Sequence, residues 1–233
     1  FQRKFSTSLL VLQLALTLGL IVNAAILALD TREKLMKPLG LELENTLALQ
    51  LLPTSGAYKD PDYFRSIVRQ DLKQLSEIEG VIEASVFNQL PIQRGGNNGN
   101  VYDAEAPQDE PRSEHANYVP NMYTTAEGLD SLGLEIVEGR NLTADDEVIG
   151  GGGETNILMT ESLAKEVFKD KPALGALSNR GRVVGIVKDF IMSPAHSPAT
   201  QKLAIFYHHI TTIPGYPHNY VLKVAPGKME SVR

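Results

Sequence analysis

The hydrophobic positions of this chain follow three patterns in turn: an unbroken apolar run, then helical spacing, then alternation. The run at residues 9–29, LLVLQLALTLGLIVNAAILAL, contains no charged residue. As a helix it is about 31 Å long, close to the roughly 30 Å of a bilayer's hydrocarbon core. It is longer than the apolar region of a signal peptide, and no A-x-A cleavage site follows before Asp30. We therefore predict a membrane-spanning helix.

Four small or polar residues interrupt this apolar run. Gln13 and Thr17 are four residues apart, as are Gly19 and Asn23, so each pair lies on one helix face. Such residues inside a bilayer are typical of contacts between transmembrane helices, although a lone anchor also tolerates a few of them. We predict helix contacts at these positions. Basic residues flank both ends of the span, so the positive-inside rule does not assign its orientation.

Helical spacing begins again at residue 60. Asp60 and Pro61 are typical of an N-cap and a first helical position, and apolar residues recur every three or four positions over residues 64–78. Gly80 ends this pattern. The next residues, VIEASVFNQL at 81–90, alternate as a strand does. A helix followed directly by a strand is therefore predicted.

A polar, proline-containing stretch follows as far as Pro120, and we expect at most short strands in it. Thr124 and Glu127 have the spacing of a capping box, which predicts a short helix closed by Gly133. Further strands are predicted at 134–139, ending at Gly139, and at 155–160, 181–188, 202–209 and 219–224, with a helix at 161–168. Because no regular βαβ repeat occurs, these elements indicate an α+β fold with mostly antiparallel sheets.

Composition narrows the class of protein. The 233 residues can form one large domain or two small ones. The net charge of -6, without a basic stripe bearing aromatic residues, excludes a nucleic-acid surface. The chain has no cysteine, which excludes disulfides and thiolate chemistry. It begins at Phe1 and stops at Arg233 as a helix is starting, so we interpret it as part of a longer protein.

The candidate binding motifs are weak. The glycines at 150–153 are not followed by the lysine of a phosphate loop, so a flexible connection is favoured. His208 and His209 are adjacent and would point to opposite faces of a strand, which argues against a shared metal. The acidic residues at 145–147 and Glu154 lack the spaced ligands of a calcium loop and are interpreted as a solvated loop. Ser162 and Ser178 have no nucleophile-elbow setting. We predict no catalytic residue, metal or cofactor.

Three ordered motifs nevertheless carry a resemblance to a known family. They are LGLEIVEGRNLTADDE, TNILMTESLAKEVFKDKPALG and GRVVGIVKDF, all downstream of the spanning helix. In this order they resemble the MacB-like periplasmic domain of ABC transporter permeases, within the MacB/FtsX-like family. The structural landmarks of the resemblance are Gly133, Gly139, Arg140, Gly175 and Gly185. Arg140 is interpreted as a landmark at a turn and not as a catalytic group, because no companion catalytic residues are found.

The resemblance implies a particular domain organisation. Residues 1–40 would hold a cytoplasmic N-terminal segment and the first transmembrane helix, with the span at about 9–29. Residues 41–97 and 198–233 would form a porter-like subdomain, and residues 98–197 an outer subdomain inserted into it. Both would lie in the periplasm of a bacterium, attached to its inner membrane, and further transmembrane helices would follow Arg233.

The resemblance also implies a function: a permease subunit of a MacB-type ABC transporter that couples cytoplasmic ATP hydrolysis to periplasmic conformational change, in efflux or envelope-related transport. No Walker motif occurs in these residues, so ATP hydrolysis must reside on a partner or outside this part of the protein, and we expect it on a separate nucleotide-binding subunit. The partners implied are an ABC ATPase subunit, a second copy or homologous permease, a periplasmic adaptor and membrane lipid. The alternatives are a membrane-anchored sensor domain of a signalling receptor and, less favoured, an anchored periplasmic hydrolase. The number of spans after Arg233 distinguishes the permease from the receptor.

Overall fold

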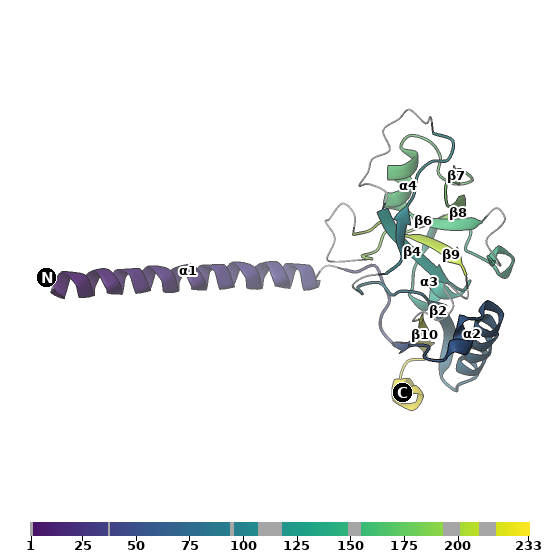
Figure 1. Ribbon diagram of the computed structural model, residues 1–233, viewed down its shortest axis with the longest axis horizontal. Coiled ribbons are helices and arrows are strands. Elements are labelled where there is room, and N and C mark those ends of the chain that lie inside the picture. Colours follow the sequence, from purple (N-terminus) through teal and green to yellow (C-terminus); the bar gives the residue numbers. More distant parts are fainter. Residues whose placement is uncertain are drawn as a thin grey trace. The chain divides into compact units, whose positions relative to one another are not determined.

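The chain contains an N-terminal helix and a domain built on a β-sheet (Figure 1). The computed structural model describes residues 2–36, 38–93, 96–106, 118–148, 155–192, 201–209 and 218–233. Two units are separable, Phe1–Leu39 and Gly40–Arg233, and each is described by itself. The glycine run predicted to be a flexible connection, at residues 150–153, and Glu154 lie outside the described residues.

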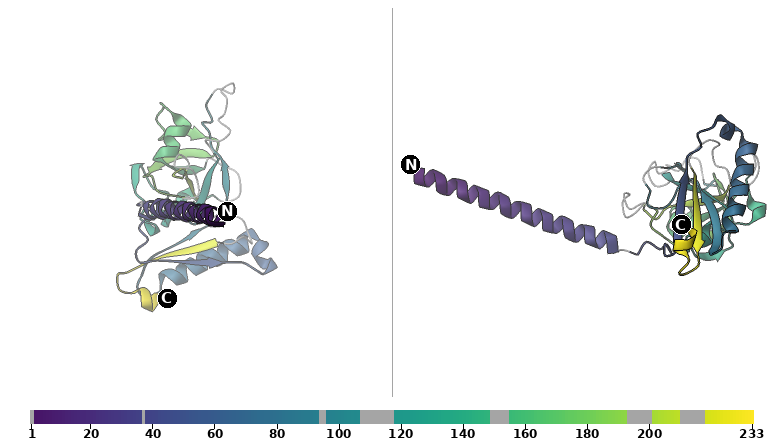
Figure 2. Two further views of the ribbon diagram at one scale, coloured as in Figure 1. Left: turned by 90° about the vertical axis from the view of Figure 1, so that its left-hand side faces the viewer. Right: turned by 90° about the horizontal axis from the view of Figure 1, so that it is seen from below.

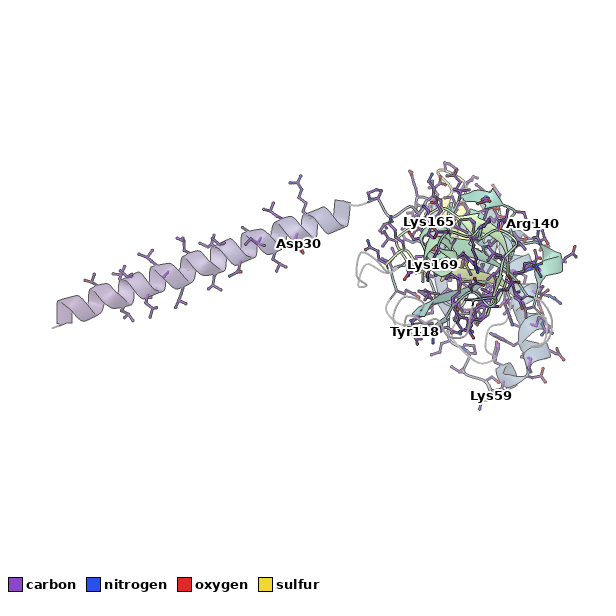
Figure 3. The ribbon with its side chains drawn as sticks, turned by 90° about the horizontal axis from the view of Figure 1, so that it is seen from above. Asp30, Lys59, Tyr118, Arg140, Lys165 and Lys169 are labelled. Carbon is purple, nitrogen blue, oxygen red and sulfur yellow. The ribbon has the colours of Figure 1, made fainter. Side chains whose placement is uncertain are left out.

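The first unit is the helix α1, Gln2–Met36. Its stretch Leu9–Arg32 is long and apolar enough to cross a membrane, judged by length and composition. Its side chains project on all sides, and Asp30 lies beyond the apolar run (Figure 3). Each polar pair forms a hydrogen bond within the helix: Thr17 Oγ1 donates to Gln13 O at 2.8 Å, and Asn23 Nδ2 donates to Gly19 O at 2.9 Å. The Thr17 hydroxyl and the Asn23 amide therefore have partners on their own backbone.

The second unit is an α+β domain. Its strands are β1 Thr46–Leu51, β2 Val81–Phe87, β3 Asn98–Asn100, β4 Tyr118–Thr124, β5 Ile136–Gly139, β6 Asn156–Thr160, β7 Leu177–Ser178, β8 Gly181–Val187, β9 Ile205–His208 and β10 His218–Val224. Its α-helices are α2 Pro61–Ser76, α3 Gly128–Ser131, α4 Glu161–Phe168 and α5 Met229–Val232, with short 3-10 helices η1 Gly56–Lys59 and η2 Ala144–Asp146.

All described strands belong to one sheet, in the order β1-β10-β2-β4-β9-β6-β8-β5, with β3 paired to β4 and β7 paired to β8. Neighbouring strands are antiparallel except for the parallel pairs β4 with β9 and β6 with β8. The prediction of an α+β fold with mostly antiparallel pairing is confirmed. β9 lies between β4 and β6, so this strand from the late part of the chain is enclosed by strands from its middle.

Several elements form where the pattern predicts them. The carboxylate of Asp60 accepts from Tyr63 N at 2.8 Å and caps α2, whose inner residues Phe64 and Val68 are buried. The helix predicted at 161–168 is α4, and its apolar side is buried. The prediction is wrong at Thr124, where the capping box was expected. Thr124 ends β4, and α3 begins after Glu127 without a side-chain cap.

The strands β1 and β4 were not predicted. β4 contains Pro120, which cannot donate a backbone hydrogen bond and made this segment look like a loop. The structure places Pro120 opposite Asn98 of the short strand β3, and β9 pairs with the following residues from Asn121 on. Pro120 therefore lies just before the residues of β4 that pair with β9, and its missing N–H does not interrupt that pairing.

Three hydrophobic clusters hold the domain together. One lies under α2 and joins Phe64 and Val68 to Val86 of β2 and Tyr220 of β10. Figure 2 shows α2 lying along these strands. A second lies under α4, around β6, β8 and β9. The third, the central cluster, includes Phe87 of β2 together with residues of β6, β8 and β9. It therefore connects the two ends of the sheet.

Candidate functional site

Two landmark glycines meet where β5 runs beside β8. Gly139 and Gly185 are direct partners in the register of these antiparallel strands, and Arg140 N donates to Val184 O at 3.0 Å. Gly139 has φ +80, and a Cβ placed on it would overlap the Val184 carbonyl oxygen. A Cβ on Gly185 would overlap the carbonyl oxygen of Arg140. Two backbones therefore approach at a distance that only glycine permits.

The Arg140 side chain binds a buried carboxylate. Nη1 lies 2.6 Å from Asp146 Oδ2, and Nη2 lies 2.9 Å from Asp146 Oδ1. Asp146 has a side chain only 3% exposed, and it also accepts from Thr143 N at 2.7 Å and from Asn156 Nδ2 at 2.6 Å. Arg140 projects at the margin of the domain in Figure 3, and 47% of its side chain is exposed. This network ties η2 to the start of β6.

The charges of this pair perturb both pKa values. The hydrogen bonds from Arg140 hold the pKa of Asp146 far below its usual range, against the opposing effect of burial. The same hydrogen bonds raise the pKa of Arg140. The interpretation of residues 145–147 as a solvated acidic loop is wrong for Asp146, because its carboxylate is buried as the partner of Arg140. An arginine held by two bonds in this way positions a turn and is not left for a substrate anion.

The other landmark glycines lie in different surroundings. Gly175 has φ +81, a Cβ added to it would meet no atom within 4 Å, and its N donates to Val183 O at 2.8 Å. It therefore lies beside β8, the strand that contains Gly185 and in which Gly185 pairs with Gly139. Gly133 has φ +66 and lies apart from them, where a Cβ would overlap the side chain of Glu42.

Glu42 belongs to the segment by which the chain enters the domain. Its N donates to Leu132 O at 2.9 Å, and its carbonyl oxygen accepts from Lys223 Nζ at 3.1 Å. Asn45 O accepts from Val224 N at 2.8 Å, and Leu41 packs against the central hydrophobic cluster. The entry segment, residues 40–45, is therefore fixed to the turn after α3 and to the end of β10.

The VKDF part of the third motif positions α4. Asp189 Oδ1 accepts from Ser162 N at 2.9 Å, and Asp189 Oδ2 accepts from Ser162 Oγ. A carboxylate bound to the first turn of a helix satisfies donors that otherwise have no intrahelical partner. Phe190 follows in the central cluster, 1% exposed. The Ser162 hydroxyl therefore serves the start of α4, and Ser178 Oγ donates to Gly181 O at 2.9 Å.

The described residues contain no group of three or more His, Cys, Asp or Glu side chains able to hold a metal. His208 is buried, and its Nδ1 lies 2.7 Å from Thr143 O. Because Thr143 also binds Asp146, the His208 ring contributes to the same turn as that carboxylate.

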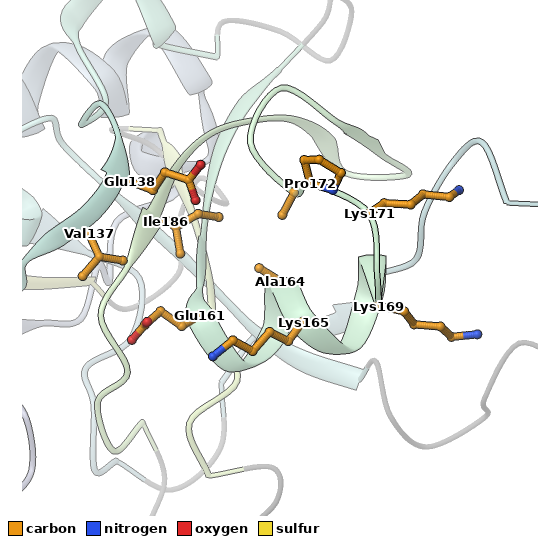
Figure 4. A pocket seen from close by; sticks show the side chains of 10 residues that line it. Val137, Glu138, Glu161, Ala164, Lys165, Lys169, Lys171, Pro172 and Ile186 are labelled. Atoms are coloured by element: carbon orange, nitrogen blue, oxygen red, sulfur yellow. The ribbon is translucent and has the colours of Figure 1, made fainter.

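A surface hollow of about 500 Å³ lies between α4, β5 and the turn after α4. Its floor is apolar, with Ala164 and Ile186, and its rim carries the lysines at 165, 169 and 171. Figure 4 shows Lys169 and Lys171 extending away from the hollow. Lys171 Nζ is bound to Asp103 at 2.8 Å. The ammonium groups therefore do not converge as they would to bind an anion.

Comparison with known proteins gives one family. Residues 9–231 match the family described as MacB-like periplasmic core domain. Among solved structures, the periplasmic region of MacB from Actinobacillus actinomycetemcomitans matches with a TM-score of 0.51 and 15% identity, covering 86% of each chain. This likeness concerns the fold alone.

Two further solved structures are similar. The extracellular domain of the noncanonic ABC-type transporter YknZ from Gram-positive bacteria has a TM-score of 0.48 and 13% identity, covering 81% of this chain and 88% of its own. A domain of a putative permease protein from Porphyromonas gingivalis has a TM-score of 0.44 and 15% identity, covering 80% of this chain and 78% of its own. No curated protein matches the chain.

Proposed function

Since this chain belongs to the family of the MacB-like periplasmic core domain, we propose that it transmits movement in an ABC transporter permease. In this proposal ATP hydrolysis on a separate cytoplasmic subunit moves the transmembrane helices, and the sheet domain moves with them. The domain performs no chemistry of its own. The partners are the ATPase subunit, a second copy or a homologous permease, and a periplasmic adaptor.

The entry segment is the observation that carries this proposal. A domain that is moved by a membrane helix needs a firm attachment where the chain enters it. Residues 40–45 have that attachment through the bonds of Glu42 and Asn45 to Leu132 and Val224. β1 follows at once and pairs with β10 along its whole length, from Thr46 opposite Lys223 to Leu51 opposite His218. The first and last strands of the domain therefore form one ribbon within the sheet.

The landmark residues support a structural role in the same proposal. Gly139 and Gly185 allow two backbones to approach, while Arg140 and Asp146 fix the turn that follows β5. A domain that conveys displacement has to resist deformation, and a buried, fully bonded carboxylate resists the opening of its turn. This use of the residues needs neither a cofactor nor a substrate.

We further propose that the domain comprises a porter-like part and an outer part, as the resemblance implies. The porter-like part contains β1, β2, β10 and α2. The cluster around Phe64 and Tyr220 joins α2, β2 and β10, and β1 pairs with β10. The outer part contains the remaining strands and α4. β9 is assigned to it because β9 is bonded on both sides to its strands, which moves the second boundary beyond residue 208.

In the same proposal α1 is the first transmembrane helix in a bacterial inner membrane, and the domain lies in the periplasm. Contacts with neighbouring transmembrane helices are proposed along the face of Gln13 and Thr17 and that of Gly19 and Asn23. Within α1 Thr17 uses its hydroxyl donor and Asn23 uses one of its two amide hydrogens, so Gln13 has the side-chain amide best suited to an interhelical bond.

Copurification tests the proposal. The full-length protein, expressed with an ABC ATPase subunit encoded by the same organism, should copurify with it in detergent, and the pair should hydrolyse ATP. The protein alone should show no nucleotide turnover. ATP hydrolysis by this protein alone, or failure to retain any ATPase subunit, would contradict the proposal.

A further inference from the structure

Part of the edge of β2 has no neighbouring strand in the described part of the chain. On one side β10 pairs with β2 from Phe87 to Val81. On the other side β4 pairs with β2 only where Phe87 lies opposite Thr124. Beyond this point β4 pairs with β9, so residues 81–86 have no strand beside them on the β4 side. Among the described residues, an interior strand of the sheet thus has an open edge, meaning one with which no strand pairs.

The direction of the backbone at this edge follows from one hydrogen bond. Asn88 N donates to Tyr123 O at 3.2 Å, so Asn88 directs its N–H toward the β4 side. Successive residues of a strand direct their backbone groups to alternate edges. Ala84, four residues earlier, therefore presents its N–H and C=O to the open side. These are the groups that an added strand would bind.

A groove of about 660 Å³ lies at this edge. α2 forms one wall with Arg69 and Leu72, β2 contributes Ile82 and Ala84, and the segment after β4 forms the other wall. Thr125 belongs to that second wall. It is only 4% exposed, and its Oγ1 has no hydrogen-bond partner among the described residues.

The acidic residues of the groove indicate that a bound ligand would carry positive charge. Glu83 and Glu127 line the groove, and neither forms an ion pair with any described residue. Burial, together with the nearby charges of Asp130 and Glu127, raises the pKa of Glu83. These carboxylates repel one another and lack a cation. On the α2 wall Arg69 is already bound to Glu147 at 2.8 Å, and Lys73 also lines the groove without an ion pair to any described residue. The carboxylates of Glu83, Glu127 and Glu147 therefore outnumber the cations of the groove.

We propose that the open edge of β2 binds an extended segment of a partner protein as an added strand, with a lysine or arginine facing Glu83 and Glu127. Main-chain bonds to Ala84 hold the segment, its basic side chain pairs with the carboxylates, and small apolar side chains cover Ile82 and Leu72. The inference stands on the edge, the groove and the charges. It goes beyond the coupling role and does not depend on it.

The test uses a fluorescein-labelled heptapeptide in which lysine alternates with valine or threonine, added to the full chain in detergent. Fluorescence anisotropy should show saturable binding. Two further peptides should bind at least about tenfold more weakly. One carries N-methyl groups that block strand pairing, and the other has glutamate in place of each lysine.

Protein variants complete the test. Ala84→Pro removes the N–H at the open edge without touching the β10 ladder, and it should weaken binding by about tenfold or more. Glu83→Gln and Glu127→Gln should also weaken binding, whereas Glu79→Gln, the same change at an exposed glutamate bound to Lys228, should not. Absence of saturable binding, equal binding of the N-methylated peptide, or equal losses in Glu79→Gln and Glu83→Gln would overturn the proposal. The N-methylated peptide decides the matter even if Ala84→Pro fails to fold.

Discussion

The guanidinium of Arg140 holds both carboxylate oxygens of Asp146, at 2.6 and 2.9 Å, and so fixes the turn between β5 and β6. Because Asp146 is almost fully buried, removing its cation leaves a charge with little access to water. Arg140→Ala should therefore lower the free energy of unfolding by about 2 kcal/mol, less than a fully buried pair would lose, since Arg140 is half exposed. Urea denaturation measures this change.

An exposed ion pair provides the control for this prediction. Lys188 lies 2.7 Å from Glu135, and both side chains are more than half exposed. Lys188→Ala should leave the free energy of unfolding nearly unchanged, because an exposed ion pair contributes little to stability. Similar losses in the two variants would show that Arg140 is an ordinary surface charge and that the turn does not depend on it.

Stability should depend on pH through Asp146. Its pKa is lowered in the folded state, first by the hydrogen bonds from Arg140, so the folded protein favours the carboxylate more than the unfolded chain does. The resulting stabilisation is fully present above the unfolded pKa of about 3.9, and it is lost as pH falls from there toward the lower pKa of the folded state.

The variant Asp146→Asn isolates this effect, because the other carboxylates remain in both proteins. The difference in unfolding free energy between the wild-type protein and Asp146→Asn should stay constant from pH about 7 to about 5 and shrink as the pH falls below about 4. Urea midpoints over this pH range measure it. A difference that stays constant with pH would mean that Asp146 titrates alike in the folded and unfolded chains.

Gly139 and Gly175 differ in their surroundings at nearly the same φ, +80 and +81. Gly175→Ala should cost only the strain of the left-handed conformation, about 1 kcal/mol. Gly139→Ala adds an overlap with the Val184 carbonyl oxygen and should cost about 3 kcal/mol or more. Thermal unfolding of the two variants compares these costs directly. Equal melting temperatures would show that the approach of β5 to β8 has room for a side chain.

The sequence pattern predicts elements whose apolar residues face a single layer. α2 and α4 follow their helical spacing because each buries one side, through Phe64 and Val68 in α2 and through Leu163 and Val167 in α4. The sequence does not predict β4, because its proline, Pro120, and its polar residues are typical of a loop. Its pairing with β9 depends on residues about 85 positions away. Long-range pairing of this kind leaves no local periodicity to detect.

The site shows the same division between local and distant information. Arg140 and its partner Asp146 lie within one turn, and the acidic residues that follow the arginine were the signal that could have revealed the pair. The meeting of Gly139 with Gly185 joins two motifs through strand register, which spacing in the sequence does not encode. The open edge of β2 likewise results from the path of β4, so it becomes visible only in the folded chain.

The central claim is that ATP hydrolysis on another subunit displaces this domain. The 233 residues have no cysteine, so Gln70→Cys, at an exposed position of α2, introduces one site for a spin label among them, and any cysteine elsewhere in the transporter is replaced by serine. In the full-length transporter reconstituted in lipid, pulsed electron paramagnetic resonance measures the distance between the labels of two permease copies, or between this label and one on a homologous permease. The account predicts one distance without nucleotide and a different one when ATP is trapped on the ATPase subunit. An unchanged distance in a transporter that hydrolyses ATP would contradict it.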